Sequence, residues 1–459
     1  MATPRIGKDC PRAAEFLRTH GLTPLRGMLT PGMFQQAHPH RPRAGTILVP
    51  EVVFWLMALA ALGAASMAAC VQALWAPLRA ALPWLPLEPV QEEAFCTARA
   101  GLPLRFFLLI FQAVVAGFNA QFPGNVQLQS AYRWKGRRLL GIDGMDTDLP
   151  RHPKLARIFP PASNQHGARG CPQARLVGLV GLQDGLCHAF RWTSLQVSEQ
   201  ASARRLAGHL QSGDLLLADR NFPDRATFAA VLARGADLLF HLPSNRFLKL
   251  SRRPTPSGRP EEWDVRIPLP PALRAQYPQF AAGIPLRILS YQRPGYRPSW
   301  LISSLLDAQE YPYQELVELY HQRWRQETFH REWKHTLTLS NLRSHSAMGL
   351  LKEVLVQLSI NNAIRWMMAQ AAPAGTAPVQ LQFLAAKRLI LSMLPVMDAA
   401  PAAQLPGLYR RLLDALSRQR ILVRPGRSFP RRWDCRGRPK GHGKIAQPAK
   451  LAPPQENHT

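Results

Sequence analysis

The feature that most constrains the fold is a series of short apolar runs separated by stretches with helical character. The runs are RRLLGID (137–143), ARLVGLVGL (174–182), DLLLAD (214–219) and ADLLFHL (236–242). Each has the length and the branched apolar content of a buried strand. The stretch 226–236 (ATFAAVLARGA) predicts a helix between the last two strands. Strands that alternate with helices predict an α/β fold whose sheet is at least partly parallel.

Composition changes along the chain predict three parts. Residues 1–135 form a mostly helical N-terminal domain, and residues 136–370 hold the α/β core. Within the core, Pro and Arg become frequent at about 243–298, which indicates a β-rich insertion. Residues 371–459 supply C-terminal helices and a basic tail rich in Pro, Gly and Arg.

The charge balance indicates a polyanionic partner. Lys and Arg total 57 against 29 acidic residues, a formal net charge of +28. Such a surplus produces a strong positive field, and nucleic acid is the commonest polyanion that a protein meets. The six cysteines are scattered without metal-binding spacing, which fits a reducing cytoplasm.

A basic membrane-associated protein is an alternative interpretation of the same composition. Residues 52–78 contain no charged residue and are long enough to span a bilayer. The segment is rich in Ala, however, and Pro50 and Glu51 begin it as they would begin a soluble helix. A buried helical domain without a membrane anchor is therefore the preferred prediction.

One predicted helix, at 313–337, carries an unusual set of polar residues. At about 100° per residue, its residues Tyr320, Arg323, Glu327 and Lys334 lie within a stripe of about 60°. A carboxylate between two cations and a phenol suits a metal site beside a nucleic-acid backbone. A solvated polar face with ordinary ion pairs is the alternative.

Two aspartates follow apolar runs in a way that suits the same site. Asp143 ends LLGID and Asp219 ends LLLAD, so both are predicted at strand ends, where α/β folds place their sites. Each could instead begin a turn or cap a helix, and Asp146 and Asp148 are near enough to compete with Asp143. Joined by Glu327, the two aspartates would make an oxygen site for Mg²⁺ or Mn²⁺.

In these residues the chain resembles the DDE transposases of bacterial insertion sequences, in the group (insertion-sequence family four) marked by a Y-(2)-R-(3)-E-(6)-K signature. The helix matches that spacing without error, and the resemblance covers roughly residues 137–435. Other matching segments are IDG (142–144), LLLADRNF (215–222), SLLD (304–307), LRS (342–344) and the R-x-x-P-R of 427–431. Met145 and His345 depart from residues that are common in the group, but neither position is a metal ligand.

The resemblance implies a ribonuclease-H-like catalytic core in which Asp143, Asp219 and Glu327 hold two Mg²⁺ ions, with Mn²⁺ as a substitute. It implies that Tyr320, Arg323 and Lys334 contact DNA phosphates. By analogy with some members, Trp300 would stack on an extruded base, although a buried strand residue is the competing interpretation.

The implied activity is cut-and-paste transposition by a cytoplasmic, nucleoid-associated enzyme. Its partners would be the terminal inverted repeats of its own element, bound in part by residues 1–135, and target DNA, in a homodimeric complex. A catalytically inactive DNA-binding derivative and a standalone nuclease of the same fold are the nearest alternatives.

Overall fold

We describe the fold from a computed structural model. It covers residues 22–40, 46–63, 66–81, 91–121, 133–164, 167–168, 170–243, 255–256, 261–292 and 298–422. The basic tail and its R-x-x-P-R segment at 427–431 lie outside these residues.

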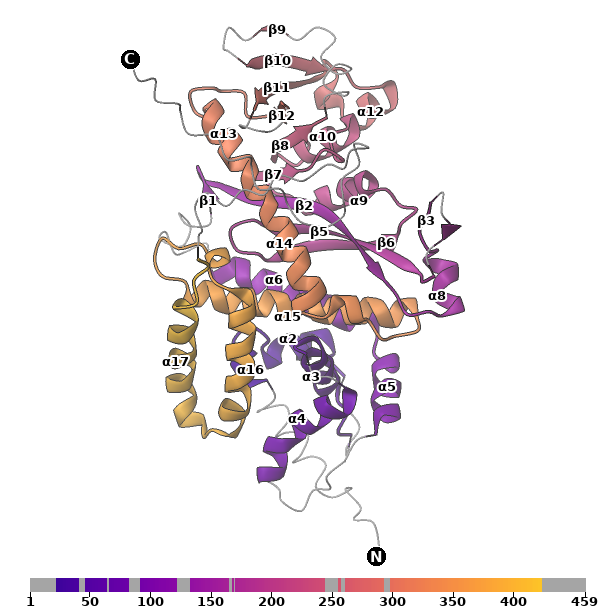
Figure 1. The fold of residues 1–459 in the computed structure, drawn as a ribbon, viewed down its shortest axis with the longest axis vertical. Coiled ribbons are helices and arrows are strands. Elements are labelled where there is room, and N and C mark those ends of the chain that lie inside the picture. The colour runs from indigo at the N-terminus through magenta and orange to yellow at the C-terminus, as the bar shows by residue number, and fades with distance from the viewer. Residues whose placement is uncertain are drawn as a thin grey trace, which may run out of the picture.

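One mixed sheet forms the centre of the α/β region (Figure 1). Its first half has the order β6-β5-β2-β7-β8, in which β2, β7 and β8 are parallel and β5 and β6 are antiparallel to their neighbours. The strands are β1 (Arg133–Trp134), β2 (Arg137–Asp148), β5 (Gln173–Gly181), β6 (Cys187–Ser194), β7 (Asp214–Ala218) and β8 (Asp237–Leu242). This order, with three antiparallel strands followed by two parallel ones, is that of a ribonuclease-H-like core.

The predicted β-rich insertion extends the same sheet. Beyond β8 the order continues β12-β11-β10-β9, all antiparallel. These strands are β9 (Thr255–Pro256), β10 (Glu262–Ile267), β11 (Ile284–Tyr291) and β12 (Ser299–Ser303), with α12 (Pro271–Gln276) and the 3₁₀ turn η4 (Pro278–Phe280) between β10 and β11. The insertion therefore adds width to the sheet.

Helices cover both faces of the sheet and divide the core in two. On one face, α9 (Glu199–Leu206), η3 (Ala207–His209) and α10 (Arg225–Leu232) bury Ile142, Ala218 and their neighbours. On the other face, the segment from α13 (Tyr313–Tyr320) to the π-helical turn η6 (Glu332–Thr336) packs on residues such as Leu139, Leu217 and Leu301. Alternate residues of each strand thus serve opposite cores, as the pleat of a strand requires.

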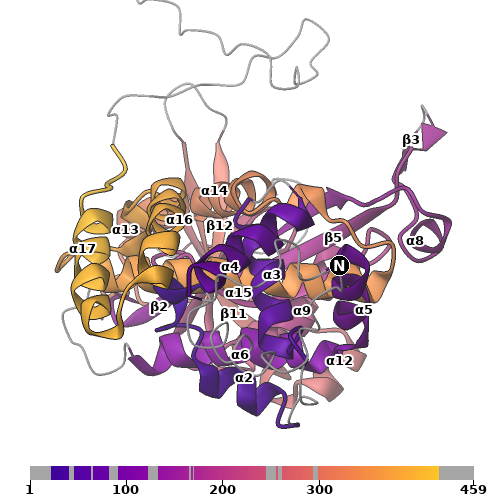
Figure 2. The ribbon, with the colours of Figure 1, turned by 90° about the horizontal axis from the view of Figure 1, so that it is seen from below.

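The helix α15 (Ala347–Ala371) joins the sheet to the remaining helices (Figures 1 and 2). N-terminal helices pack on it from one side and C-terminal helices from another, and all share the larger core. The N-terminal elements are η2 (Thr23–Leu25), α2 (Pro31–Ala37), α3 (Pro50–Ala61), α4 (Met67–Ala81), α5 (Glu92–Gly101) and α6 (Leu104–Gln121). The C-terminal elements are η8 (Pro378–Gln380), α16 (Phe383–Ala399), η9 (Ala402–Gln404) and α17 (Leu405–Ser417).

A small lobe projects from the body in both views, formed by α8 (Pro153–Ile158) and the hairpin of β3 (Ser163–Asn164) and β4 (Gly167–Ala168) (Figures 1 and 2). The lobe directly follows β2 in the chain.

The uncharged segment 52–78 does not form one long helix. It is divided between α3, whose side chains are almost all buried, and α4, and Gly63 between them has a positive φ of 108°. Within the described residues, α6 is the helix that is long and apolar enough to cross a membrane. One face of α6 packs inside the protein, where Phe111 meets Phe190 of β6 and Phe118 meets Trp366 of α15.

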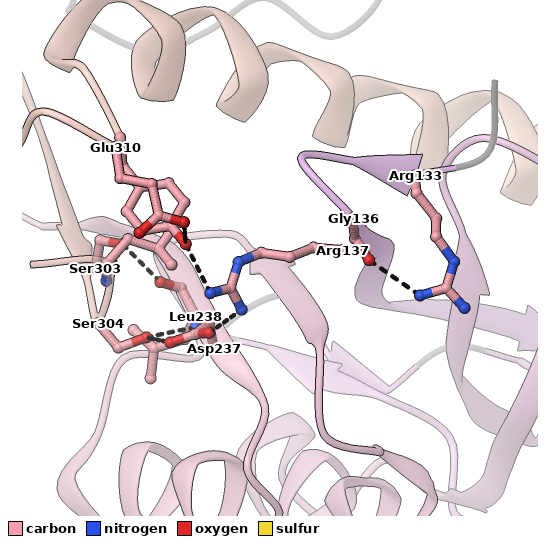
Figure 3. Close-up of polar contacts among 10 residues, drawn as sticks. Arg133, Gly136, Arg137, Asp237, Leu238, Ser303, Ser304 and Glu310 are labelled. Atoms are coloured by element: carbon pink, nitrogen blue, oxygen red, sulfur yellow. Dashed lines mark hydrogen bonds and ion pairs between the residues drawn. The ribbon is translucent and has the colours of Figure 1, made fainter. Parts of the chain in front are cut away.

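A polar network fastens the edge of the sheet where β2, β7 and β8 begin (Figure 3). The Arg137 guanidinium pairs with Asp237 and donates to the Tyr311 hydroxyl at 2.8 Å, and Tyr311 donates to Glu310. Asp237 also accepts from the Ser304 hydroxyl at 2.7 Å. The stretch that leads from β12 into α13 is therefore tied to β2 and β8, which fixes where α13 begins.

Candidate active site

The parallel strands β2 and β7 bring Asp143 and Asp219 together. Ile142 of β2 lies beside Ala218 of β7, and neighbouring strands are about 4.8 Å apart. Because Ile142 and Ala218 both face the α9–α10 core, the residues that follow them, Asp143 and Asp219, point to the other face, toward α14 (Arg325–Arg331). The prediction that Asp143 ends its strand is wrong, since β2 continues to Asp148; Asp219 does directly follow β7.

The predicted helix 313–337 is continuous but irregular. It consists of α13 (Tyr313–Tyr320), a 3₁₀ segment (η5, His321–Trp324), α14 (Arg325–Arg331) and a π-helical segment (η6, Glu332–Thr336). These segments turn by more and by less than 100° per residue, so the idealised stripe is distorted. π-Helical segments are frequent at functional sites.

Two glycines let α14 approach the sheet closely beside Asp143. A Cβ on Gly141 would lie 2.4 Å from the Gln326 side-chain oxygen, and one on Gly178 would lie 3.0 Å from the Trp333 ring. Gln326 in turn donates to the Gly178 carbonyl at 3.3 Å. The bare strand surface therefore sets the distance between α14 and β2.

Arg323 lies among the carboxylates that these elements assemble. Its guanidinium is 3.9 Å from Asp143 and 3.6 Å from Glu327, one turn further along the helix. Burial lowers the pKa of Arg323, but Tyr320, Asp143, Asp219 and Glu327 together raise it above its ordinary value. Its Nε is buried without a hydrogen-bond partner.

The carboxyl of Asp143 has a raised pKa. Burial raises the pKa of its carboxyl to about 7, and the negative charge of Asp219 adds to the shift. The Arg323 charge and the Gly144 N–H, which donates at 2.8 Å, oppose it. A buried carboxylate beside another carboxylate needs either a proton or a cation.

The donor set fits divalent cations in kind. Carboxylates from β2, from the end of β7 and from α14 supply the oxygen ligands that Mg²⁺ and Mn²⁺ prefer. As the side chains lie, no three histidine, cysteine, aspartate or glutamate residues in the described part of the chain are spaced to hold an ion. Arg323 is in contact with two of the three carboxylates instead.

The other predicted site residues differ in how they are placed. Tyr320 is buried, with 4% of its surface exposed, and its ring lies 6.0 Å from the Arg323 guanidinium. Lys334 lies in the π-helical segment, half-buried, and its ammonium makes no ion pair with a carboxylate of the described residues. Trp300 is half-buried against the α9–α10 core, on the opposite face of the sheet from Tyr320.

The competing aspartates of β2 are engaged elsewhere. Asp146 pairs with Arg175 of β5 at 2.7 Å, and Asp148 accepts from Gln173 at 2.5 Å. Both lie on the opposite pleat of β2 from Asp143, away from α14. The geometry thus favours Asp143 among the three.

Two residues near the site were missed by the sequence analysis. Glu199, the first residue of α9, is 17% exposed, and its charge helps to raise the pKa of Asp143, while the charge of Asp219 helps to raise the pKa of Glu199. His330 of α14 is buried beside Trp333, and burial, with the charges of Lys334 and Arg323, lowers its pKa to about 3. Nothing in the spacing around either residue distinguishes it from an ordinary helical Glu or His.

Comparisons with known proteins find transposases. Residues 134–360 match the family model of the transposase DDE domain. The chain is 26% identical over 303 residues to the transposase InsG for insertion sequence element IS4 of Escherichia coli (strain K12), a match that covers 65% of this chain and 68% of that protein. The cryo-EM structure of a piggyBac transposase synaptic complex with hairpin DNA aligns over 93% of this chain and 88% of its own, at 12% identity and a TM-score of 0.40. The chain belongs to the DDE transposases, in the family of the IS4 element's enzyme.

Proposed function

We propose that this protein is a cut-and-paste transposase that cleaves DNA at the ends of its own element and joins the freed 3′-hydroxyls to target DNA. Asp143, Asp219 and Glu327 would hold the two divalent ions, with Mg²⁺ as the natural ion and Mn²⁺ as a substitute. The observation that carries the proposal is the position of Arg323, whose guanidinium lies 3.9 Å from Asp143 and 3.6 Å from Glu327 and whose pKa is also raised by the charge of Asp219.

The ions would supply acidification of the attacking water or hydroxyl and stabilisation of the leaving oxygen. The chain's own residues would bind the DNA and orient the reacting phosphodiester. The three carboxylates fix the place of the reacting phosphodiester at the sheet edge, and no histidine base is required. His330, the histidine on α14, is held neutral inside the core and does not serve as one.

Arg323 would act first as a counter-ion and then as a phosphate ligand. Without cations it neutralises the carboxylates through contacts of 3.6 and 3.9 Å, and its Nε lacks an acceptor. Cations at the carboxylates would release it toward the DNA backbone, where a guanidinium binds phosphate well. Tyr320 beneath it would keep its orientation, and Lys334 would contact the backbone further along.

The remaining surface would bind DNA mainly through charge. With a net charge of +28, binding should fall steeply as salt rises. We propose that the terminal inverted repeats are bound in part by the N-terminal helices, that two copies of the chain join two ends, and that Trp300 stacks on an extruded base.

The test is a nicking assay on a DNA fragment that carries an element end, in Mg²⁺, with the variant Glu327→Gln. Nicking should be abolished, while binding to the end in a gel-shift assay stays nearly intact. Glu318→Gln is the matched control, because Glu318 is an exposed carboxylate of α13 on the same helical segment.

Nicking by Glu327→Gln at the wild-type rate would refute the ligand assignment. Absence of nicking by the wild-type protein would favour an inactive DNA-binding derivative. Nicking without strand-transfer products would indicate a standalone nuclease.

A further inference from the structure

The space beside Gly144 points to another acidic residue in the site. Gly144 follows Asp143 on β2 and points to the opposite face, toward α9. A Cβ at this position would lie 2.3 Å from a Glu199 carboxylate oxygen and 3.0 Å from its carboxyl carbon. Because Gly144 has no side chain, the Glu199 carboxylate lies directly against the α9 face of β2, one residue along the strand from Asp143.

The start of α9 fixes Glu199 in this place. Ser198 caps the helix, and its hydroxyl accepts from Ala201 N at 3.1 Å. Ala203 and Leu206, on the same helix, are buried in the α9–α10 core. The backbone of Glu199 is therefore held against the sheet, and its side chain extends toward the catalytic edge.

The Glu199 carboxylate has weak partners where it lies. The guanidinium of Arg175 is 3.7 Å away, and the same group makes its shorter contacts, 2.7 and 3.1 Å, with Asp146. Asn221 donates to the other oxygen at 3.5 Å. Asn221 also donates its backbone N–H to Asp219 at 2.8 Å, which links Glu199 to the second metal-ligand candidate.

The charges at this edge are unbalanced. Asp143, Asp219 and Glu199 repel one another, since the charge of each acts on its neighbours. Arg323 and Arg175 are the cations within ion-pair distance of the site carboxylates in the described parts of the chain, and Arg175 is mainly occupied by Asp146. Arg323 and Arg175 thus compensate the cluster only in part, and a divalent cation would neutralise the remaining negative charge.

We propose that Glu199 is a further acidic residue of the cation site, which approaches it from α9 and binds the water shell of the ion held by Asp143 and Asp219. Mg²⁺ keeps several of its waters in proteins, and carboxylates that accept from such waters tune its affinity. Glu199 is thus a positioning residue. The inference rests on the proposed function, because it needs a cation between Asp143 and Asp219.

An alternative is that Glu199 only interacts favourably with the N-terminus of its own helix. That role requires neither a glycine at 144 nor a position beside Asp143. It would affect the stability of α9 without affecting cation affinity, so the two roles can be separated by measurement.

The experiment is titration of the full-length protein with Mn²⁺, with free Mn²⁺ measured by electron paramagnetic resonance, for the wild type and for Glu199→Gln, Asp143→Asn and Glu92→Gln. Thermal unfolding of each protein in EDTA provides the stability readout. Glu92→Gln is the matched control, since it removes the same charge from an exposed position in the first turn of α5.

Glu199→Gln should weaken Mn²⁺ binding roughly 10- to 100-fold, leave the number of bound ions unchanged and leave the melting temperature in EDTA unchanged. Glu92→Gln should bind as the wild type does. Wild-type affinity in Glu199→Gln, with weakened affinity in Asp143→Asn, would overturn this inference alone. Wild-type affinity in both would refute the proposed cation site itself. If Glu199→Gln weakens Mn²⁺ binding and lowers the stability in EDTA by an equal free energy, the role of Glu199 is to hold α9, and the inference would also be overturned.

Discussion

Replacing Asp143 with Asn should remove a specific pH dependence of stability in the cation-free protein. The carboxyl has an ordinary pKa of 3.8 in the unfolded chain and about 7 in the fold. A raised folded-state pKa means that the folded protein binds the proton more tightly than the unfolded chain does. The stabilisation from that proton is complete below pH 3.8 and is lost as the pH rises through 7.

The size of the effect follows from the two pKa values. The shift corresponds to roughly 4 kcal/mol in total, of which about 2 kcal/mol is lost between pH 5.5 and pH 8. The side chain is 17% exposed, so screening by solvent is limited. Asn has nearly the same shape and does not titrate, so Asp143→Asn should be stabilised relative to the wild type, and more so at pH 8 than at pH 5.5.

The assay is thermal unfolding in EDTA at the two pH values, for the wild type, Asp143→Asn and Asp146→Asn. Asp146 is the control because it lies on the same strand with 44% of its side chain exposed. Comparing wild type with variant at each pH cancels the general effect of pH on a highly basic chain. At roughly 2–4 °C for each kcal/mol, the gap between wild type and Asp143→Asn should widen by several degrees. An equal gap at both pH values would refute the description of Asp143 as a buried acid that needs a proton or a cation.

Two further predictions concern how the site is supported. Gly141→Ala would place a Cβ 2.4 Å from the Gln326 oxygen and 2.8 Å from Leu182, so it should lower the free energy of unfolding by about 1–3 kcal/mol and should also reduce the rate of nicking. Gly208→Ala, with open space around it, should change neither quantity. Equal nicking by the two variants would contradict the close approach of α14. Arg287→Met should destabilise the insertion by about 3–5 kcal/mol in denaturant unfolding, because Glu262 would stay buried without the guanidinium that donates to it at 2.6 Å. The double variant Arg287→Met/Glu262→Leu should recover much of the lost stability. If Arg287→Met is as stable as the wild type, the buried ion pair does not support the insertion.

The strands could be predicted from the sequence because short-range patterns determine them, and the same patterns make Asp143, Asp219 and Glu327 the candidate acids. The buried strands β7 and β8 appear as unbroken apolar runs, and the fold class follows from their alternation with helices. The spacing from Tyr320 to Lys334 specifies one helical segment. The strand β6 was not predicted, because its sequence CHAFRWTS mixes polar and apolar residues on a half-exposed strand.

The arrangement around Asp143 could not be predicted because it depends on contacts between distant segments. The length of β2 beyond Asp143 is set by pairing with β5, down to Asp148 against Gln173. The close approach of Gln326 to Gly141 and of Trp333 to Gly178 joins one helical segment to two strands that are distant from it in the sequence. Glu199 reaches the site only because Gly144 is bare, and these two residues are 55 positions apart.

The most direct test of the site is a structure of the protein bound to its element end in Mn²⁺, with the ions located by anomalous scattering. We expect Mn²⁺ density in contact with Asp143, Asp219 and Glu327, with Arg323 moved away from the carboxylates toward a DNA phosphate. Mn²⁺ bound elsewhere, or Arg323 still paired with Asp143 and Glu327 while DNA is engaged, would contradict it.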